Sequence, residues 1–189
     1  MTNPDQPILE RKFCATEAAI ELTGSTEISG YASLFGRPDQ GGDIVGPGAY
    51  DASLKRFADT GRRVKMLWQH DPTQPIGIWE EVRADATGLF VKGRLLQEVA
   101  RGREAAALIA AGAIEGLSIG YRTRRAERDP QGRRLLTELE LWEVSLVTFP
   151  MLAEARVGSK AGAAQDTPPS LLGDLAEALD SARRDLTRG

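Results

Sequence analysis

The sequence predicts an α+β fold whose centre is a small, mostly antiparallel β-barrel flanked by helices. Three observations lead to this prediction. Over roughly the first 150 residues, β-branched and aromatic residues alternate with polar ones in short stretches. Turn-forming segments separate these stretches, and two segments with helical character interrupt them. Hairpins with inserted helices are typical of α+β proteins, and a closed or nearly closed barrel is the favoured arrangement of such strands.

Six stretches are predicted to be strands, and a seventh, over residues 8–14, is expected to open the domain. The six cover residues 28–35, 64–70, 76–84, 89–95, 118–125 and 134–148. Two four-residue segments predict hairpin connections, because they place Asp first and Gly last. These are Asp85-Ala86-Thr87-Gly88 and Asp129-Pro130-Gln131-Gly132. Residues 35–47 contain several glycines and are expected to form a long loop.

Two helices are predicted over residues 50–60 and 102–111, each followed by a glycine that can end a helix in the left-handed conformation. The composition changes after Val157, so residues 1–157 are predicted to form one domain. Residues 158–170 read as a flexible linker, and residues 171–189 as an amphipathic helix with leucines at spacings of three and four. Docking of this helix on its own domain and binding to a partner are both open.

Composition narrows the class of protein. The chain has 189 residues, which fits one domain with an appendage, and a net charge of −3 with acids and bases interspersed. Nucleic acid and anionic membrane are therefore not the expected partners. The expected partner is a protein or a small molecule. The single cysteine, Cys14, cannot form an internal disulfide, and no stretch resembles a membrane span or signal peptide. We expect a reducing, cytosolic compartment.

The chain has one histidine, His70, and any chemistry that needs an imidazole must use it. Ser118 lies in a G-x-S-x-G sequence, the spacing of a nucleophile elbow. In α/β-hydrolases the histidine follows the serine, whereas His70 precedes Ser118, so the sequence excludes that fold and argues against an esterase of that type. A serine hydroxyl needs a neighbouring base to be a nucleophile at neutral pH, and His70 is the candidate base.

A third residue usually orients such a histidine, and three glutamates of the last predicted strand are candidates. Period-two alternation puts Glu143 on one face with apolar neighbours, and Glu138 and Glu140 on the opposite face. A carboxylate beside apolar neighbours is costly without a partner, but alternation does not decide which face meets solvent, so the choice among the three glutamates stays open here. Alternation alone cannot bring His70, Ser118 and Glu143 together.

Other candidate sites are weaker. Asp39 and Asp43 lie in the glycine-rich loop, but their spacing fits no EF-hand, and neither a metal nor a cofactor is predicted. Cys14 lacks a nucleophile motif and is expected to be a buried structural residue. Backbone N–H groups near Ser118 are candidates for an oxyanion hole. The arginines that follow could assist, although a solvated charged strand explains them better: Arg122, Arg124 and Arg125.

Five motifs occur in one order between residues 28 and 157. They are Gly30-Tyr31-Ala32-Ser33-Leu34-Phe35, Gly42-Asp43-Ile44-Val45-Gly46-Pro47-Gly48-Ala49-Tyr50, Leu67-Trp68-Gln69-His70-Asp71, Gly116-Leu117-Ser118-Ile119-Gly120-Tyr121 and Trp142-Glu143-Val144-Ser145-Leu146-Val147-Thr148-Phe149-Pro150. With these motifs the chain resembles the prohead maturation proteases of tailed bacteriophages and their relatives, which share the herpesvirus assemblin type of serine-protease fold.

The resemblance implies a small β-barrel with helices and a catalytic order of histidine, serine and a third orienting residue, in agreement with His70, Ser118 and Glu143. In the herpesvirus branch the third residue is a second histidine, which this chain lacks. A complete triad therefore requires an acidic replacement, with Glu143 in the matching place and Glu140 as the alternative.

The resemblance also implies a function. It predicts a serine endopeptidase that is packaged inside the procapsid in the cytoplasm of the bacterial host. Its substrates would be scaffold or amino-terminal segments of the major capsid protein, and the protease itself. Related folds dimerise, which makes a homodimer an expectation. The alternative function is a catalytically degenerate, scaffold-like assembly protein that acts by binding capsid protein.

Overall fold

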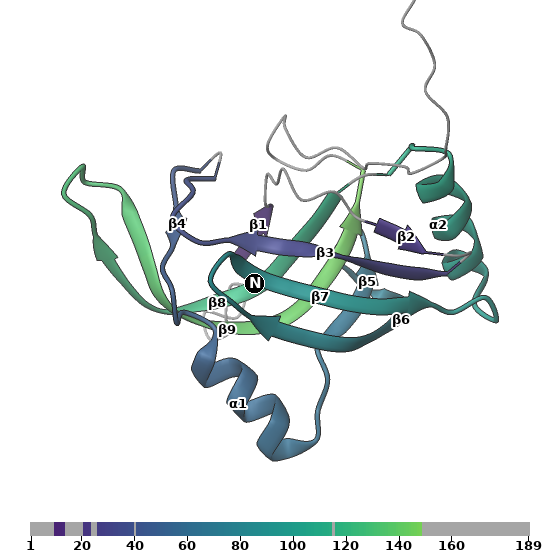
Figure 1. Cartoon of the computed structure of the whole chain (residues 1–189), viewed down its shortest axis with the longest axis horizontal. Helices are drawn as coiled ribbons and strands as arrows, with labels where there is room; N and C mark the ends of the chain where they lie inside the picture. The colour runs from purple at the N-terminus through teal and green to yellow at the C-terminus, as the bar shows by residue number, and fades with distance from the viewer. Residues whose placement is uncertain (1–9, 14–20, 24–25, 40, 115, 149–189) are drawn as a thin grey trace, which may run out of the picture. The chain divides into compact units, whose positions relative to one another are not determined.

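The computed structural model of the chain describes residues 10–13, 21–23, 26–39, 41–114 and 116–148. The predicted linker over 158–170, the predicted helix over 171–189 and Cys14 lie outside the described residues. The described part is an α+β fold with one curled sheet and two helices (Figure 1). Within it, no helix is both long enough and apolar enough to span a membrane.

The elements follow one another along the chain as the motifs predict, with two extra short strands. The strands are β1 (Glu10–Phe13), β2 (Glu21–Thr23), β3 (Glu27–Leu34), β4 (Ile44–Val45), β5 (Lys65–Trp68), β6 (Asp71–Ala84), β7 (Gly88–Leu95), β8 (Gly116–Arg128) and β9 (Arg134–Val147). The helices are α1 (Asp51–Thr60) and α2 (Ala100–Ala110).

The strand order is β1-β8-β9-β5-β6-β7-β3-β2, and β4 pairs with β9 outside this order. Most pairs are antiparallel, as predicted, but β9 pairs in parallel with both β4 and β5. The sheet curls into a half-barrel (Figure 1). In the described residues its hydrogen-bonded order ends at β1 and β2, so the sheet is open there.

Two boundaries differ from the sequence prediction. The predicted loop over residues 35–47 contains β4, because the apolar pair Ile44–Val45 is buried and pairs with Leu135 and Leu136 of β9. Strand β6 begins at Asp71 instead of residue 76, in spite of two prolines in its first half. Prolines are tolerated there because β7 pairs with β6 only from Gly77 onward, which leaves one side of that half without ladder bonds.

The helices support the sheet from different places, α1 against β9 and α2 against β6 and β7 (Figure 1). Helix α1 ends where the sequence predicts, because Gly61 adopts the left-handed conformation with φ 64° and donates its N–H to the Ala58 carbonyl. Buried residues of β8 and β9, among them Ile119, Val144 and Leu146, belong to one hydrophobic core with residues of the other strands. Strands β8, β9 and β5 are thereby fixed side by side.

Candidate active site

Ser118 lies within strand β8. Its register partner on β9 is Ser145, and its partner on β1 is Phe13. The residue has no exposed surface. The G-x-S-x-G sequence is therefore not a strand-to-helix elbow here, in agreement with the exclusion of an α/β-hydrolase.

His70 lies in a two-residue turn between β5 and β6, and not at the end of a strand as the sequence predicted. Trp68 pairs with Asp71, and the two residues between them have positive φ angles, 51° for Gln69 and 62° for His70. Two successive positive φ angles are typical of a type I′ turn, which usually needs Asn or Gly. For other residues this conformation costs about 1–3 kcal/mol each. Strain of this kind persists only where surrounding contacts hold it.

The contacts that hold this turn come from the end of β9. The N–H of Gln69 donates to the Leu146 carbonyl over 2.9 Å, and the N–H of His70 donates to Ser145 Oγ over 3.1 Å. The Gln69 side chain donates from Nε2 to Thr148 Oγ1 over 2.6 Å. The ring of His70 is thus held over β9 by backbone and side-chain bonds.

Glu143 projects from β9 toward the ring of His70. Its Oε1 lies 2.5 Å from His70 Nδ1, and its Oε2 accepts a hydrogen bond from Ser145 Oγ over 2.5 Å. Both side chains are buried, with 4% of His70 and 5% of Glu143 exposed. The burial of this carboxylate is compensated by two donors, as a buried charge requires.

Gly120 makes room for this carboxylate. It pairs with Glu143 across β8 and β9, and a Cβ atom at Gly120 would lie 2.2 Å from Glu143 Oε1. No real Cβ contact is that close. The second glycine of G-x-S-x-G is thus required by the neighbouring acid, and not by a turn at the serine.

The structure brings the three predicted residues together. His70 Nε2 lies 2.7 Å from Ser118 Oγ, on the side of the ring opposite Glu143. A carboxylate can only accept, so Nδ1 carries the ring proton and Nε2 is left to accept from the Ser118 hydroxyl. This is the tautomer that a general base for the serine needs.

Glu140, the alternative third residue, is placed elsewhere. Its carboxylate accepts hydrogen bonds from Arg56, over 2.9 Å, and from Arg124. The Arg125 side chain lies 3.8 Å from Glu138, and Arg122 stacks over the ring of Trp142. These arginines belong to a surface charge cluster, as the sequence reading favoured.

The two aspartates of the glycine-rich loop have structural partners. Asp39 Oδ1 accepts the N–H of Asp43, and Asp43 Oδ2 pairs with Arg134 over 2.9 Å. Across the described residues, no three His, Cys, Asp or Glu side chains gather closely enough to hold a metal ion.

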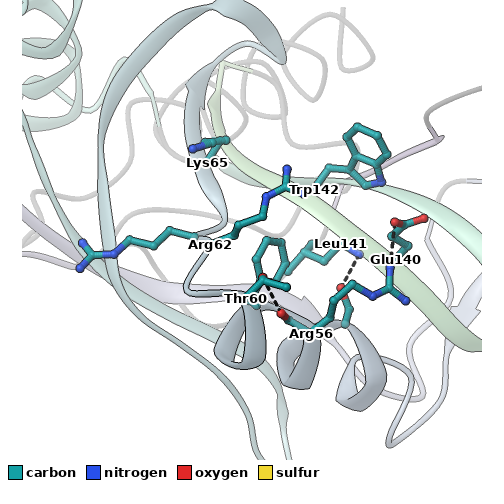
Figure 2. A pocket seen from close by; sticks show the side chains of 10 residues that line it. Arg56, Thr60, Arg62, Lys65, Glu140, Leu141 and Trp142 are labelled. Carbon is teal, nitrogen blue, oxygen red and sulfur yellow. Dashed lines mark hydrogen bonds and ion pairs between the residues drawn. The ribbon is translucent and has the colours of Figure 1, made fainter.

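A pocket of about 300 Å³ lies between α1 and β9 and is separate from the three residues (Figure 2). Its wall combines an exposed tryptophan with cationic side chains; the lining residues are Ser53, Arg56, Phe57, Thr60, Arg62, Arg63, Lys65, Glu140, Leu141 and Trp142. Ser118, His70 and Glu143 are not among the residues that line it.

The sequence reading missed one polar residue of the site, Ser145. It donates to Glu143 and accepts from His70, and it is fully buried. A signal was present in the sequence, because Ser145 follows Glu143 by two residues and so shares its face of the strand.

Comparisons of the sequence with known proteins found a matching family model and similar proteins. A sequence model of the caudovirus prohead serine proteases matches residues 15–168. The chain is 30% identical over 159 residues to the prohead protease of Enterobacteria phage HK97. This alignment covers 81% of this chain and 69% of that protein. The chain is 34% identical over 140 residues to the capsid polyprotein of Pseudomonas phage PAJU2, which covers 70% of this chain but 20% of that protein.

A solved structure has a similar fold. The capsid assembly protease of bacteriophage T4 superimposes with a TM-score of 0.59 at 15% sequence identity, and the match covers 75% of this chain and 98% of that one. At this identity the likeness concerns the curled sheet and the helices.

Proposed function

The chain belongs to the caudovirus prohead serine protease family, and we propose that Ser118, His70 and Glu143 are its catalytic triad. It is accordingly a serine protease of capsid assembly. The observation that carries the proposal is the chain of hydrogen bonds from Ser118 Oγ through the His70 ring to Glu143 Oε1. The order of histidine, serine and acid along the sequence also fits.

In the first half of the reaction, Ser118 Oγ attacks a peptide carbonyl while its proton passes to His70 Nε2. Glu143 stabilises the imidazolium that forms, through the bond it already makes to Nδ1. His70 then gives the proton to the leaving amine as the peptide C–N bond breaks, and the acyl group stays on Ser118.

In the second half, water attacks the acyl carbonyl. His70 takes a proton from this water and returns it to Ser118 Oγ, so that the carboxylic acid leaves and the enzyme is restored. The tautomer fixed by Glu143 is the same in both halves.

Substrate access requires a local movement. Ser118 has no exposed surface, and 7% of the surface of the whole His70 residue, backbone included, is exposed. A peptide carbonyl can approach Ser118 Oγ to bonding distance only after a neighbouring segment moves. Catalysis by this triad therefore includes an opening step before the chemistry.

The proposed substrates are scaffold or amino-terminal segments of the major capsid protein, cleaved inside the procapsid in the host cytoplasm. The names of the relatives support this choice, since one is a prohead protease and another a capsid polyprotein. A homodimer is also proposed. We further propose that the complete domain over residues 1–157 is an assemblin-like barrel, followed by a linker over 158–170 and an amphipathic helix over 171–189.

The linker is proposed as a site of self-cleavage, because small residues and Pro168-Pro169 dominate its composition. Mass spectrometry of the purified protein should detect a product that ends between residues 158 and 170. An active enzyme whose chain stays intact would contradict this.

The central experiment is expression together with the capsid subunit of the same particle. We expect the wild type to shorten the capsid protein, and Ser118→Ala and His70→Ala to leave it at full length. Circular dichroism and melting temperature serve as folding controls for both variants. Continued cleavage by Ser118→Ala would overturn the proposed mechanism, and uncleaved capsid protein bound stably by a folded wild type would favour the scaffold-like alternative.

A further inference from the structure

We propose that Ser145 is a positioning residue that fixes both Glu143 and His70 for catalysis. This inference rests on the proposed triad and extends it to a fourth side chain, one that does not touch the substrate. Its hydroxyl bridges the two groups, since Oγ donates to Glu143 Oε2 over 2.5 Å and accepts the backbone N–H of His70 over 3.1 Å.

The place of Ser145 in the sheet explains how one hydroxyl reaches both groups. On β9 it pairs with Ser118 of β8 on one side and with Leu67 of β5 on the other. Strand β5 leads directly into the His70 turn. Ser145 is therefore the point where the strand of the nucleophile, the strand of the acid and the turn of the base meet.

The first function of the hydroxyl concerns the carboxylate. Glu143 Oε1 faces the His70 ring, and Oε2 has Ser145 as donor. A carboxylate held at both oxygens cannot rotate freely about its last bond, so Oε1 stays in line with Nδ1. Without the hydroxyl, the carboxylate has one donor fewer in a buried setting and is free to turn.

The second function concerns the strained turn. His70 has a φ angle of 62°, a conformation that costs about 1–3 kcal/mol for a residue other than glycine. Its N–H is buried and finds its acceptor in Ser145 Oγ. Loss of that acceptor removes a buried hydrogen bond from the residue that must hold its ring between two partners.

The test compares Ser145→Ala with Ser145→Thr, which keeps a hydroxyl, and with Ser53→Ala as a matched control. Ser53 is also buried, and its Oγ accepts the N–H of Leu141 of β9 over 2.9 Å, away from the triad. Loss of Ser53 removes one buried hydrogen bond to β9, and loss of Ser145 removes the two that join Glu143 to the His70 turn. Only the loss of Ser145 should affect the base.

For Ser145→Ala we expect kcat on the capsid substrate to fall about 10- to 100-fold, with KM little changed, the range typical for groups that orient a functional side chain. Ser145→Thr should recover most of the rate, and Ser53→Ala should keep it. Equal rates for wild type and Ser145→Ala, or equal losses in the Ala and Thr variants, would overturn the proposal.

A second readout does not depend on activity. His70 is the single histidine of the chain, so the NMR signal of a proton on Nδ1 has one possible source. We expect a downfield Nδ1–H signal in the wild type and in Ser53→Ala, and its weakening or loss in Ser145→Ala below the melting temperature. An unchanged signal in Ser145→Ala would overturn the inference, whereas cleavage by Ser118→Ala would overturn the triad itself.

Discussion

Two hairpin turns of the same sheet are built in opposite ways. The turn between β6 and β7 is held by its own residues, because Asp85 Oδ1 accepts the N–H groups of Thr87 and Gly88. The turn between β5 and β6 consists of Gln69 and His70, both at positive φ, and its bonds run to the end of β9, more than 70 residues away in sequence.

The difference shows how the fold keeps the His70 turn in a conformation that the local sequence does not favour. The Asp85 turn also bonds to the Tyr31 hydroxyl and the Phe35 N–H, but the donors to Asp85 Oδ1 come from the turn itself. The turn with the proposed base is kept in place by the strand that also supplies the proposed acid. Substitutions that disturb Glu143 or its contacts with the His70 turn should therefore damage activity, while substitutions in the Asp85 turn should reduce stability alone.

The largest effect is expected from Glu143→Gln. The amide keeps the size of the side chain but cannot stabilise an imidazolium, so kcat/KM should fall by roughly 10³- to 10⁴-fold. The melting temperature should change little, and cleavage of the capsid subunit gives the rate. Glu140→Gln is the matched control, because it removes a charge from the same strand and breaks surface contacts with Arg56 and Arg124. Equal activity in the two variants would move the acid's role away from Glu143.

Gly120→Ala, a change on β8, tests whether the Glu143 carboxylate must keep its place beside His70. The new Cβ would lie 2.2 Å from Glu143 Oε1, so the carboxylate must leave its place beside His70. Activity should fall about 100-fold or more, bounded by the loss in Glu143→Gln, because that variant removes the charge altogether. Gly46→Ala is the control, since its Cβ would have only ordinary contacts, at 3.5 and 3.6 Å. Full activity of Gly120→Ala would show that Glu143 can act from another position.

The sequence predicted well those parts of the fold whose hydrogen bonds join residues close in sequence. The Asp85 and Asp129 turns, the end of α1 at Thr60 and the long β8–β9 hairpin follow from residues that are close in sequence. Local hydrogen bonds and period-two alternation are sufficient signals for such elements.

The parts that depend on distant contacts were missed. Alternation extended β5 through His70, because nothing in the Gln-His pair indicates a turn, and β4 is too short to have a pattern of its own. For the site, a single histidine and a G-x-S-x-G serine named two residues, but the face of β9 that meets them depends on tertiary packing. Alternation puts Ser145 on the face of Glu143, but it was given no role because a lone serine between apolar neighbours resembles ordinary strand sequence.

Asp85→Ala should affect the other turn and only its stability. It removes the acceptor for Thr87, Gly88 and the Tyr31 hydroxyl, and the free energy of unfolding should fall by about 1–2 kcal/mol in urea titrations. Activity should not change. Glu81→Ala is the control, because its exposed pair with Arg83 contributes little. Impaired catalysis by folded Asp85→Ala would break the separation between the two turns.

Acidic pH should remove the stability that the hydrogen bonds to the Asp85 carboxylate contribute. Burial raises the pKa of the Asp85 carboxyl, but hydrogen bonds, led by those from the Thr87 N–H and the Tyr31 hydroxyl, lower the pKa from 3.8 to about 2. A lowered pKa in the folded state adds stability that is present above the unfolded value and lost as the pH falls through the folded one. The stability difference between wild type and Asp85→Ala should thus shrink between pH 4 and pH 2.

The smallest effect, and one of opposite sign, is expected from Gln69→Gly. Glycine adopts φ 51° without the cost that Gln69 has there, although it loses the side-chain bond to Thr148 and gains freedom in the unfolded chain. Thr148→Ala removes the bond between Gln69 Nε2 and Thr148 Oγ1, keeps the longer one from the Thr148 N–H to Gln69 Oε1, and leaves the turn residue unchanged. Relative to Thr148→Ala, Gln69→Gly should therefore be more stable by up to about 1 kcal/mol, with the triad geometry kept. Stability below that of Thr148→Ala would contradict this, because it would mean that the strain relieved at Gln69 is smaller than the cost of glycine's freedom in the unfolded chain and of its lost bonds.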